Sequence, residues 1–405
     1  MTHRNEHKNF IFYTLCLVFS SVGMVSMLPG TALPFLASQT NVSLDIAGWV
    51  LTSSSIGYTF GVILAGQLSK RLGPRYLLMT ACALLAIASP VIPMTHIFWI
   101  LLLAQFTVGI GSGIVDVSIN HAMTLTFTDT LGEMLNKLHS SFGIGALTGP
   151  LLLSLVLAVF HEAVWAFIIG MTLAILALIL LTFMRLPTQL PAPATQPTTQ
   201  RAAGRSRSIF MQLALWLLAL QLFLYVGGEV SFGGWITSAL SQAATIPLAE
   251  AAPAATLFWL GLTLGRLAGG QILKREWLSE KALLYLCFFG GFVSGLFAAV
   301  FIGNIWIAFA GSLFIGIFCA PIFPGVMAIA SRRFADSLSS ASTVILVGSG
   351  SSGFVFPPLV GVVLTHVGIG WSLLIPALLL LAIALPFMLV KPETREIASV
   401  PGETF

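Results

Sequence analysis

Long stretches of apolar residues fill most of the chain, and short polar or glycine-rich segments separate them. A helix of about 20 apolar residues crosses the roughly 30 Å hydrocarbon layer of a membrane. Stretches of this length predict twelve transmembrane helices and therefore an all-α membrane protein. Their approximate bounds are 10–36, 45–69, 75–94, 97–126, 135–159, 162–185, 209–240, 248–273, 280–301, 304–331, 337–365 and 369–390.

Segment 186–208 interrupts this pattern between the sixth and seventh stretches. It holds four prolines and three arginines but no acidic residue, which is typical of a solvated linker. We therefore expect two bundles of six helices, at 1–185 and 209–392. The linker at 186–208 and the tail at 393–405 are expected to be cytoplasmic.

A short sequence occurs twice, once in each half. Segment 61–71 reappears as 265–275, with five identical positions at a constant offset of 204 residues. The same offset pairs Gly30 with Gly234. This repeat predicts two pseudo-symmetric halves with a cleft between them, the layout of transporters that work by alternating access.

Composition and charge agree with a membrane location. Hydrophobic residues make up 57% of the chain and charged residues 8%, whereas a soluble domain carries about a quarter charged residues. With the N-terminus in the cytoplasm, 17 of the 18 Lys and Arg residues lie in cytoplasmic segments and none in an outer loop. We therefore expect a multi-pass protein of the plasma (inner) membrane with both termini cytoplasmic. Its basic residues would contact the lipid bilayer and not nucleic acid.

Several function classes find no support in the sequence. No nucleophile–base arrangement, nucleotide-binding loop or metal-binding cluster is visible, so we expect no enzyme, no cofactor and no metal. The chain shows no soluble assembly domain, which favours a monomer. The cysteines lie singly in apolar runs, without disulfide or metal-binding spacing: Cys16, Cys82, Cys287 and Cys319.

Three charged residues fall well inside the predicted membrane spans: Asp116 in the fourth, Glu229 in the seventh and Arg266 in the eighth. A charge at the centre of a bilayer costs about 2.5–3.5 kcal/mol on insertion scales and is tolerated where it faces protein or water. These residues are therefore the first candidates for a functional site.

Asp116 and Asn120 are four residues apart and share one face of the fourth helix. In a partly dry cavity the protonated form of a carboxyl group is favoured, so Asp116 can load and release a proton near neutral pH. A sodium ion is an alternative ligand. Asn120, and Gln105 in the same span, are candidates for binding a substrate hydroxyl. Asp116 could instead only hold neighbouring helices together.

Glu229 lies in a segment with four glycines in eight residues, which predicts a break or bend in the seventh helix. Aromatic side chains beside a carboxylate suit a sugar or polyol, which has an apolar C–H face and a rim of hydroxyl groups. The candidates for this pocket are Glu229, Gln221, Tyr225, Phe232 and Trp235. Glu229 could also take part in proton coupling.

Arg266 lies eight residues before Lys274, about 12 Å from the cytoplasmic surface. Three roles remain open for this residue. It could form a structural ion pair, compensate the charge of Asp116 or Glu229, or bind an anionic substrate.

The loop between the second and third spans contains Gly66, Lys70, Arg71, Gly73 and Arg75. Together with twelve spans and a central linker, it resembles the major facilitator superfamily. This resemblance implies a structural role for these residues in switching between conformations. Lys70 departs from the family pattern because the family has an aspartate at its position.

Shorter stretches resemble the fucose/glucose permease group of that superfamily, including glucose-transporter-like relatives. They are Asp116-x-x-x-Asn120, the fifth-span segment 138–150 and the Gly228-Glu229 dipeptide. The resemblance implies that Asp116 takes part in proton coupling and that Asn120 touches sugar. One departure is that the first span has no acidic residue, whereas the fucose-type permease has an aspartate there.

Gly145-x-x-x-Gly149-Pro150 also resembles part of a motif of drug/proton antiporters, although tight helix packing explains it equally well. The expected function is cation-coupled uptake of a hexose of the glucose or fucose type, driven by H⁺ or alternatively Na⁺. The alternative is proton-driven export of amphiphilic drugs or metabolites. In either case two halves would rock about a site at the membrane midplane.

Overall fold

The computed structural model describes residues 2–127, 130–186, 210–334 and 337–390. Every regular element in these ranges is a helix, and twelve helical segments are long and apolar enough to cross a membrane. The all-α, twelve-span prediction is therefore confirmed. Nearly all of the predicted linker and the whole predicted tail lie outside the described residues, so their bounds stay predictions.

The N-terminal half comprises α1 (Thr2–Thr31), α2 (Leu33–Gln39), α3 (Leu44–Ala47), α4 (Trp49–Met94), α5 (Phe98–Thr126), α6 (Leu131–Phe160) and α7 (Val164–Phe183). The C-terminal half comprises α9 (Leu213–Ala243), α10 (Leu248–Ala251), α11 (Pro253–Lys274), α12 (Glu280–Val300), α13 (Ile305–Cys319), α14 (Ile322–Arg333), α15 (Leu338–His366), α16 (Ile369–Ala382) and α17 (Ala384–Leu389).

Glycine and proline set the helix boundaries. Gly73 has a φ of 68°, a conformation that glycine adopts without a steric penalty, and here the chain turns from the second span into the third within α4. Pro321 separates α13 from α14, so the tenth span is made of two helices. The first span ends at Thr31, before the predicted bound, because a new short helix with Pro34 in its first turn begins there.

The sequence predicts a break or bend in the seventh span; the predicted break is wrong, and the bend stays a prediction. Helix α9 runs unbroken from Leu213 to Ala243 through all four glycines. The missing side chains let neighbouring residues approach closely: a β-carbon on Gly234 would lie 2.7 Å from a methyl carbon of Leu51. Packing against surrounding helices therefore outweighs the low helix propensity of glycine.

The sequence repeat is a repeat in structure. Gly61 of α4 lies against the carbonyl oxygen of Ile110 on α5, and its repeat mate Gly265 of α11 lies against the carbonyl oxygen of Ile317 on α13. Equivalent helices of the two halves are thus packed by equivalent glycines. This agrees with the predicted pseudo-symmetry.

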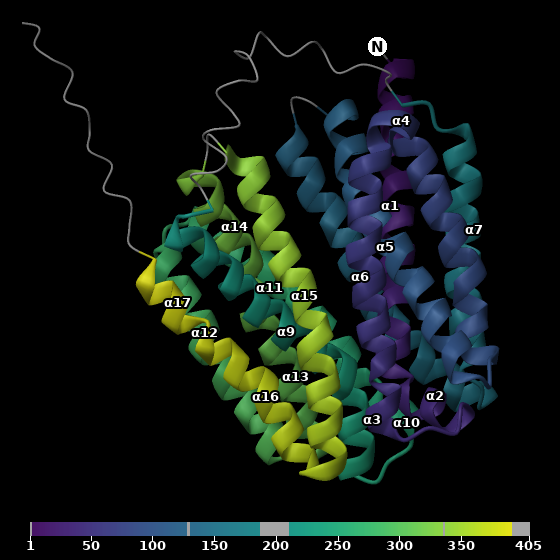
Figure 1. Cartoon of the computed structure of the whole chain (residues 1–405), viewed down its shortest axis with the longest axis vertical. Helices are drawn as coiled ribbons and strands as arrows, with labels where there is room; N and C mark the ends of the chain where they lie inside the picture. The colour runs from purple at the N-terminus through teal and green to yellow at the C-terminus, as the bar shows by residue number, and fades with distance from the viewer. Residues whose placement is uncertain (1, 128–129, 187–209, 335–336, 391–405) are drawn as a thin grey trace, which may run out of the picture.

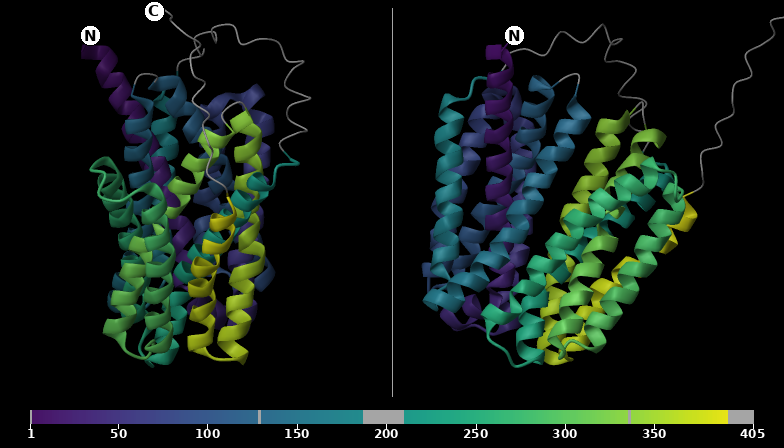
Figure 2. Two further views of the ribbon diagram at one scale, coloured as in Figure 1. Left: turned by 90° about the vertical axis from the view of Figure 1, so that its left-hand side faces the viewer. Right: turned by 180° about the vertical axis from the view of Figure 1, so that it is seen from behind.

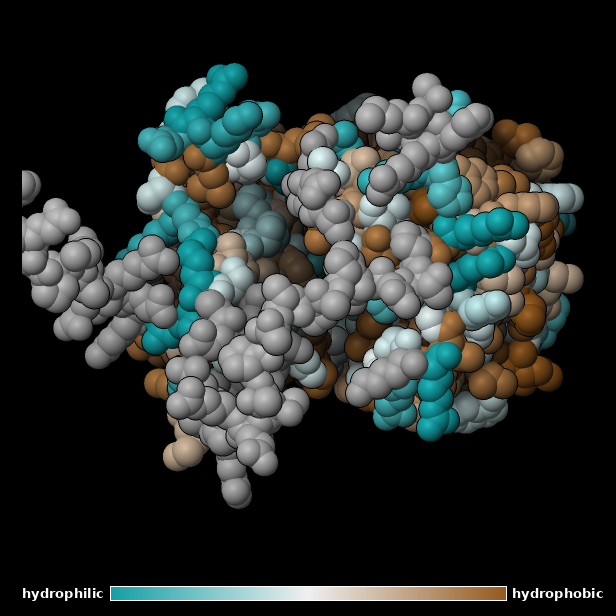
Figure 3. All heavy atoms as spheres, turned by 90° about the horizontal axis from the view of Figure 1, so that it is seen from above, coloured by the Kyte–Doolittle hydropathy of each residue, from teal (hydrophilic) through white to brown (hydrophobic). Residues whose placement is uncertain are grey.

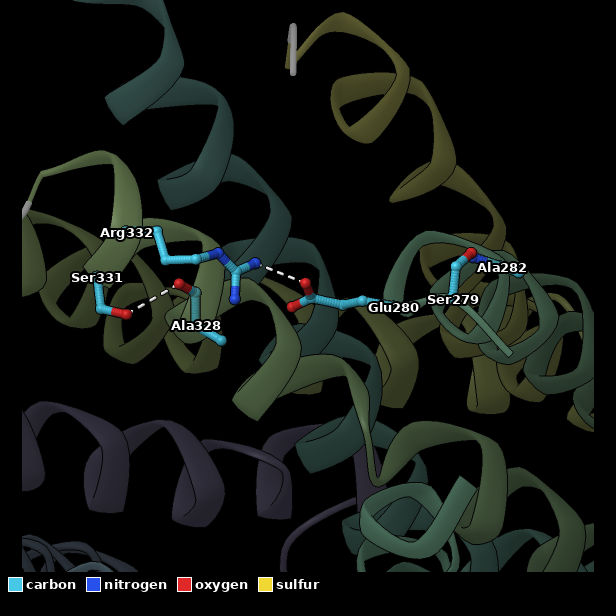
Figure 4. A network of polar contacts seen from close by, with 6 residues as sticks. All are labelled: Ser279, Glu280, Ala282, Ala328, Ser331 and Arg332. Carbon is cyan, nitrogen blue, oxygen red and sulfur yellow. Dashed lines mark hydrogen bonds and ion pairs between the residues drawn. The ribbon is translucent and has the colours of Figure 1, made fainter. Parts of the chain in front are cut away.

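The two bundles stand side by side, converge at one end and diverge at the end that carries the N-terminus (Figures 1 and 2). We call these the closed end and the open end. Two arginines at the open end each join helices of the same half. Arg75 donates hydrogen bonds to the carbonyls of Leu181 (3.0 Å) and Thr182 (2.5 Å) at the end of α7. Figure 4 shows the corresponding pair in the C-terminal half, where Arg332 of α14 donates to Glu280 of α12 at 2.5 Å.

Candidate functional site

Two antiparallel helix pairs, α4 with α15 and α6 with α11, form seams between the halves. In the first seam Gly353 lies against the hydroxyl of Ser55, and a β-carbon on Gly350 would lie 3.4 Å from the hydroxyl of Thr59. Farther toward the open end, a β-carbon on Gly66 would meet no atom within 4 Å. The first seam therefore parts between Thr59 and Gly66.

The second seam parts in the same way. At the closed end the Ser154 hydroxyl donates to the Ala249 carbonyl at 2.6 Å. Nearer the middle, a β-carbon on Gly143 would lie 2.7 Å from the hydroxyl of Thr263, whereas Gly270 has no atom within 4 Å. Seen from the open end, the molecule is hollowed between the two halves (Figure 3). The hollow reaches to about the depth of Thr263.

On the N-terminal side of this hollow, Asp116 of α5 is half-buried. The Tyr58 hydroxyl of α4 donates a hydrogen bond to its carboxylate at 2.6 Å. Asn120 donates its amide N–H to the Asp116 main-chain carbonyl, also at 2.6 Å. Gln105 lies deeper in α5 and is buried, and its amide oxygen has no hydrogen-bond partner among the described residues.

Tyr58 is a functional candidate that the sequence analysis did not single out. The chain has only five tyrosines, so one inside the second apolar span is a weak signal. Its pairing with Asp116 depends on the close approach of α4 and α5, which Gly61 and Gly113 permit. Hydropathy alone does not reveal that contact.

On the C-terminal side, Gln221, Tyr225, Glu229 and Phe232 follow one face of α9. Gln221 and Tyr225 are fully buried, yet the Gln221 amide and the Tyr225 hydroxyl have no hydrogen-bond partner among the described residues. The Glu229 carboxylate lies within electrostatic range of that hydroxyl and is partly exposed. Unpaired buried polar groups are costly, so this face is suited to a polar ligand or to water.

Arg266 and His139 connect these two sides. Arg266 of α11 interacts electrostatically with Glu229 and also with His139 of α6, and Asp116 acts on the same histidine. The three charges that the sequence analysis found inside the membrane therefore surround one region, contributed by both halves. Within the described ranges, Arg266 forms no ion pair and no hydrogen bond.

Trp235 does not join the other pocket candidates. It lies six residues beyond Glu229, about 9 Å nearer the closed end, and is fully buried. Its indole N–H donates to the carbonyl of Pro357 at 2.9 Å, and β-carbons on Gly48 and Gly361 would lie 2.7 and 2.6 Å from its ring. In this conformation Trp235 seals the closed end and does not face the hollow.

One ion pair joins the halves at the closed end. Asp45 of α3 lies 3.5 Å from the imidazole of His366, at the end of α15. The His366 side chain is 65% exposed, so water screens the pair. It therefore adds little to the contact made by Trp235.

The residues predicted to have structural roles lie outside the central site. Gly66 faces the hollow, Gly73 forms the turn, Arg75 anchors α7 and Arg71 is exposed. Nothing is described for the side chain of Lys70.

The fifth-span glycines pack two helices together. Gly145 of α6 lies against the carbonyl of Ser20 on α1, and a β-carbon on Gly149 would lie 3.0 Å from the carbonyl of Met24. Pro150 follows inside the same helix. Tight contact between α1 and α6 thus accounts for this stretch without a role in drug export.

The family model described as Major Facilitator Superfamily matches residues 15–293 and 223–404. The glucose/mannose transporter GlcP of Bacillus subtilis (strain 168) is 24% identical over 364 residues, which cover 88% of this chain and 86% of GlcP. Sodium-dependent glucose transporter 1 of Danio rerio is 25% identical over 388 residues, which cover 87% of this chain and 64% of that protein.

Solved structures share the fold. The nucleoside transporter NupG superposes with a TM-score of 0.78 at 14% identity, covering 94% of this chain and 100% of that chain. The fucose:proton symporter FucP of E. coli superposes with a TM-score of 0.64 at 19% identity, covering 94% and 98%. At these identities the likeness concerns the arrangement of the helices.

Proposed function

The chain belongs to the major facilitator superfamily, and from this premise we propose that it is a secondary transporter for a hexose of the glucose or fucose type. Two relatives are named as glucose transporters, and a solved structure with this fold is a fucose:proton symporter. Family membership and twelve apolar spans make the chain an integral multi-pass membrane protein and not an enzyme. We assign it to the plasma (inner) membrane as a monomer.

The observation that carries the proposal is the unpaired polar face of α9. The Gln221 amide is buried without a hydrogen-bond partner among the described residues, and the Tyr225 hydroxyl lies beside the Glu229 carboxylate. Sugar hydroxyls would satisfy the amide and bridge to the Tyr225–Glu229 pair. Phe232 lies on the same face, but it is buried and its ring packs against Phe258, so it would support the pocket from behind and not touch the sugar in this conformation. Asn120 and Gln105 would add amides from the other half.

Coupling to a cation rests on Asp116. A carboxylate that accepts one hydrogen bond from Tyr58 at the edge of the hollow can exchange a proton with water from the open end. Protonation removes its charge and lets the site close around the sugar. H⁺ is the ion we propose, and Na⁺ is the alternative that one relative's name suggests.

The orientation follows from the basic residues. The open end carries the N-terminus, which the positive-inside rule places in the cytoplasm. We therefore interpret this structure as the inward-open state of an alternating-access cycle. Closure of the open end and parting of the closed end would expose the same site to the outside.

Export of amphiphilic drugs is the less favoured alternative. Neither relative named above is a drug exporter, and helix packing explains the glycines of the fifth span.

The test is a thermal-stability screen of the purified protein with hexoses, nucleosides, sugar acids and amphiphilic drugs. A bound ligand at 100 times its Kd stabilises a protein by about 2.7 kcal/mol, which raises Tm. We expect glucose-like compounds to raise Tm and Tyr225→Phe to weaken the shift. Stabilisation by drugs alone, or by nucleosides alone, would overturn the proposal. Hits are then tested for uptake into proteoliposomes with an imposed H⁺ or Na⁺ gradient.

A further inference from the structure

Arg266 and His139 face each other at the point where the second seam parts. Gly143 and Thr263 are in contact there, as described above. His139 precedes Gly143 by four residues, and Arg266 follows Thr263 by three. Because α6 and α11 are antiparallel, both steps lead one turn toward the open end on the facing sides of the two helices.

Two carboxylates from different halves lie around the Arg266–His139 pair. Arg266 interacts electrostatically with Glu229 on its own side, and Asp116 lies across the hollow, close enough to act on His139. Arg266 is partly exposed, and in the part of the chain that the structure describes neither carboxylate forms an ion pair with it. In this conformation Arg266 therefore interacts with Glu229 without a direct ion pair, and its guanidinium group is free to form one.

The surface beyond Arg266 is shaped for closure. Gly270 lies one further turn along the same face of α11 and meets no atom within 4 Å. Nothing bulky on that face would prevent α11 from approaching α6 when the open end shuts. This movement carries Arg266 toward the N-terminal half and toward Asp116.

We infer that Arg266 is a counter-charge which Asp116 acquires when the open end closes. The inference rests on the proposed function. It adds a condition for the step in which the empty carrier closes its open end again. With Asp116 protonated, the loaded carrier closes without an unpaired charge. With Asp116 ionised, the empty carrier closes only because Arg266 compensates the carboxylate in a site that loses its water. Arg266 is thus a positioning residue for coupling and need not touch the sugar.

The other titratable groups around Asp116 limit how pH can act. Tyr58 approaches from α4 and His139 from α6, and Glu229 and Tyr225 lie with Arg266 on the opposite half. Helix α1 also packs against α5 but has no acidic or basic residue between Lys8 and its end. Among the described groups shown to interact with Asp116 or Arg266, His139 ordinarily titrates near neutral pH, so it has to be controlled for.

Closure can be measured without substrate, by the rate at which a water-soluble thiol reagent labels Gly270→Cys in detergent. Labelling of Gly66→Cys reports in the same way whether the first seam is closed. The protein without an added cysteine gives the background labelling of the four native cysteines. All variants carry His139→Gln, so that this histidine does not contribute to the pH dependence. The reactive form of a cysteine is its thiolate, so each labelling rate is expressed relative to the rate of a small free thiol at the same pH. With Arg266 present, this relative labelling rate should change little with pH.

Arg266→Gln should label rapidly at alkaline pH and slow on acidification, because only the form with a neutral Asp116 can then close. We expect a change within the roughly 5- to 150-fold range typical of coupling between sites. Arg266→Lys keeps the charge and should restore the weak pH dependence. A labelling rate of Arg266→Gln that stays independent of pH would refute the inference.

Paired substitutions identify the partner. Asp116→Asn with Arg266→Gln removes both charges and should restore slow labelling at every pH. Glu229→Gln with Arg266→Gln should not restore slow labelling. The reverse result would assign Arg266 to a local ion pair in the C-terminal half and overturn the inference. Counterflow exchange of glucose by the otherwise unmodified protein is measured in parallel. Its absence would count against the proposed hexose function, while the labelling results still decide the role of Arg266.

Discussion

At the closed end, a β-carbon on Gly30 would lie 2.9 Å from the Cα of its repeat mate Gly234, whereas the repeat mates Gly66 and Gly270 at the open end each face empty space. Both ends are built from the same duplicated helices. One pair of repeat mates is thus in contact, and the other pair is free for the second closure that the proposed transport cycle requires. Two bundles that rock as rigid bodies can engage only one end at a time, which is the requirement for alternating access.

The two ends also differ in chemistry. The closed end is sealed by one large side chain, Trp235, held between Gly48 and Gly361. The open end offers small residues and, one turn deeper, the charged Arg266. We therefore expect contact at the closed end to depend on aromatic packing, and closure of the open end to depend on charge.

The largest effect should come from substitutions that sterically block the closure of one end at a time. Gly361→Leu would place a side chain where Trp235 lies and prevent closure there, whereas Gly66→Leu would prevent closure of the open end. Both should abolish exchange as well as accumulation. They should have opposite effects on labelling of Gly270→Cys: Gly361→Leu should protect this cysteine, and Gly66→Leu should leave it fully reactive. Similar labelling in both variants would show that the two ends are not alternatives.

Asp116→Asn should separate the two transport modes. Gradient-driven accumulation in proteoliposomes should disappear, because the site no longer releases a proton. Counterflow exchange should persist in part, because a neutral site can still close at either end. Uphill uptake at the normal level would remove Asp116 from the coupling role.

Trp235→Ala should weaken the closed end by about 3–5 kcal/mol, the usual cost of removing a buried aromatic side chain. Trp235→Phe keeps a ring and loses the hydrogen bond to Pro357, which should cost about 1 kcal/mol. Protection of Gly66→Cys from the thiol reagent measures the shift toward the state in which the open end is shut. Equal protection in both variants would mean that the ring does not seal this end.

The smallest effect is expected from His366→Gln. An exposed pair is worth about 1 kcal/mol or less. The labelling rate of Gly66→Cys should therefore change only slightly in His366→Gln and in Asp45→Asn alike. A large shift in either variant would show that this pair, and not Trp235, dominates the closed end.

Sequence and structure diverge where helix packing decides the outcome. The glycines around Glu229 predict a broken helix, but contacts such as that of Gly234 with Leu51 keep α9 continuous. Trp235 was grouped with Glu229 because the two are near in sequence, yet the helix carries it into the seal. Tyr58 gained its importance only through its contact with Asp116.

The sequence by itself determined the number of spans, the duplicated halves, the family and the three charges inside the membrane. These follow from hydropathy, from an internal repeat and from the cost of burying charge, all of which are local properties of the chain. Only the tertiary structure decided which residues meet across the halves and which end is shut. Those depend on the rotation of each helix and on a choice between two arrangements of the same bundles, which local patterns do not encode.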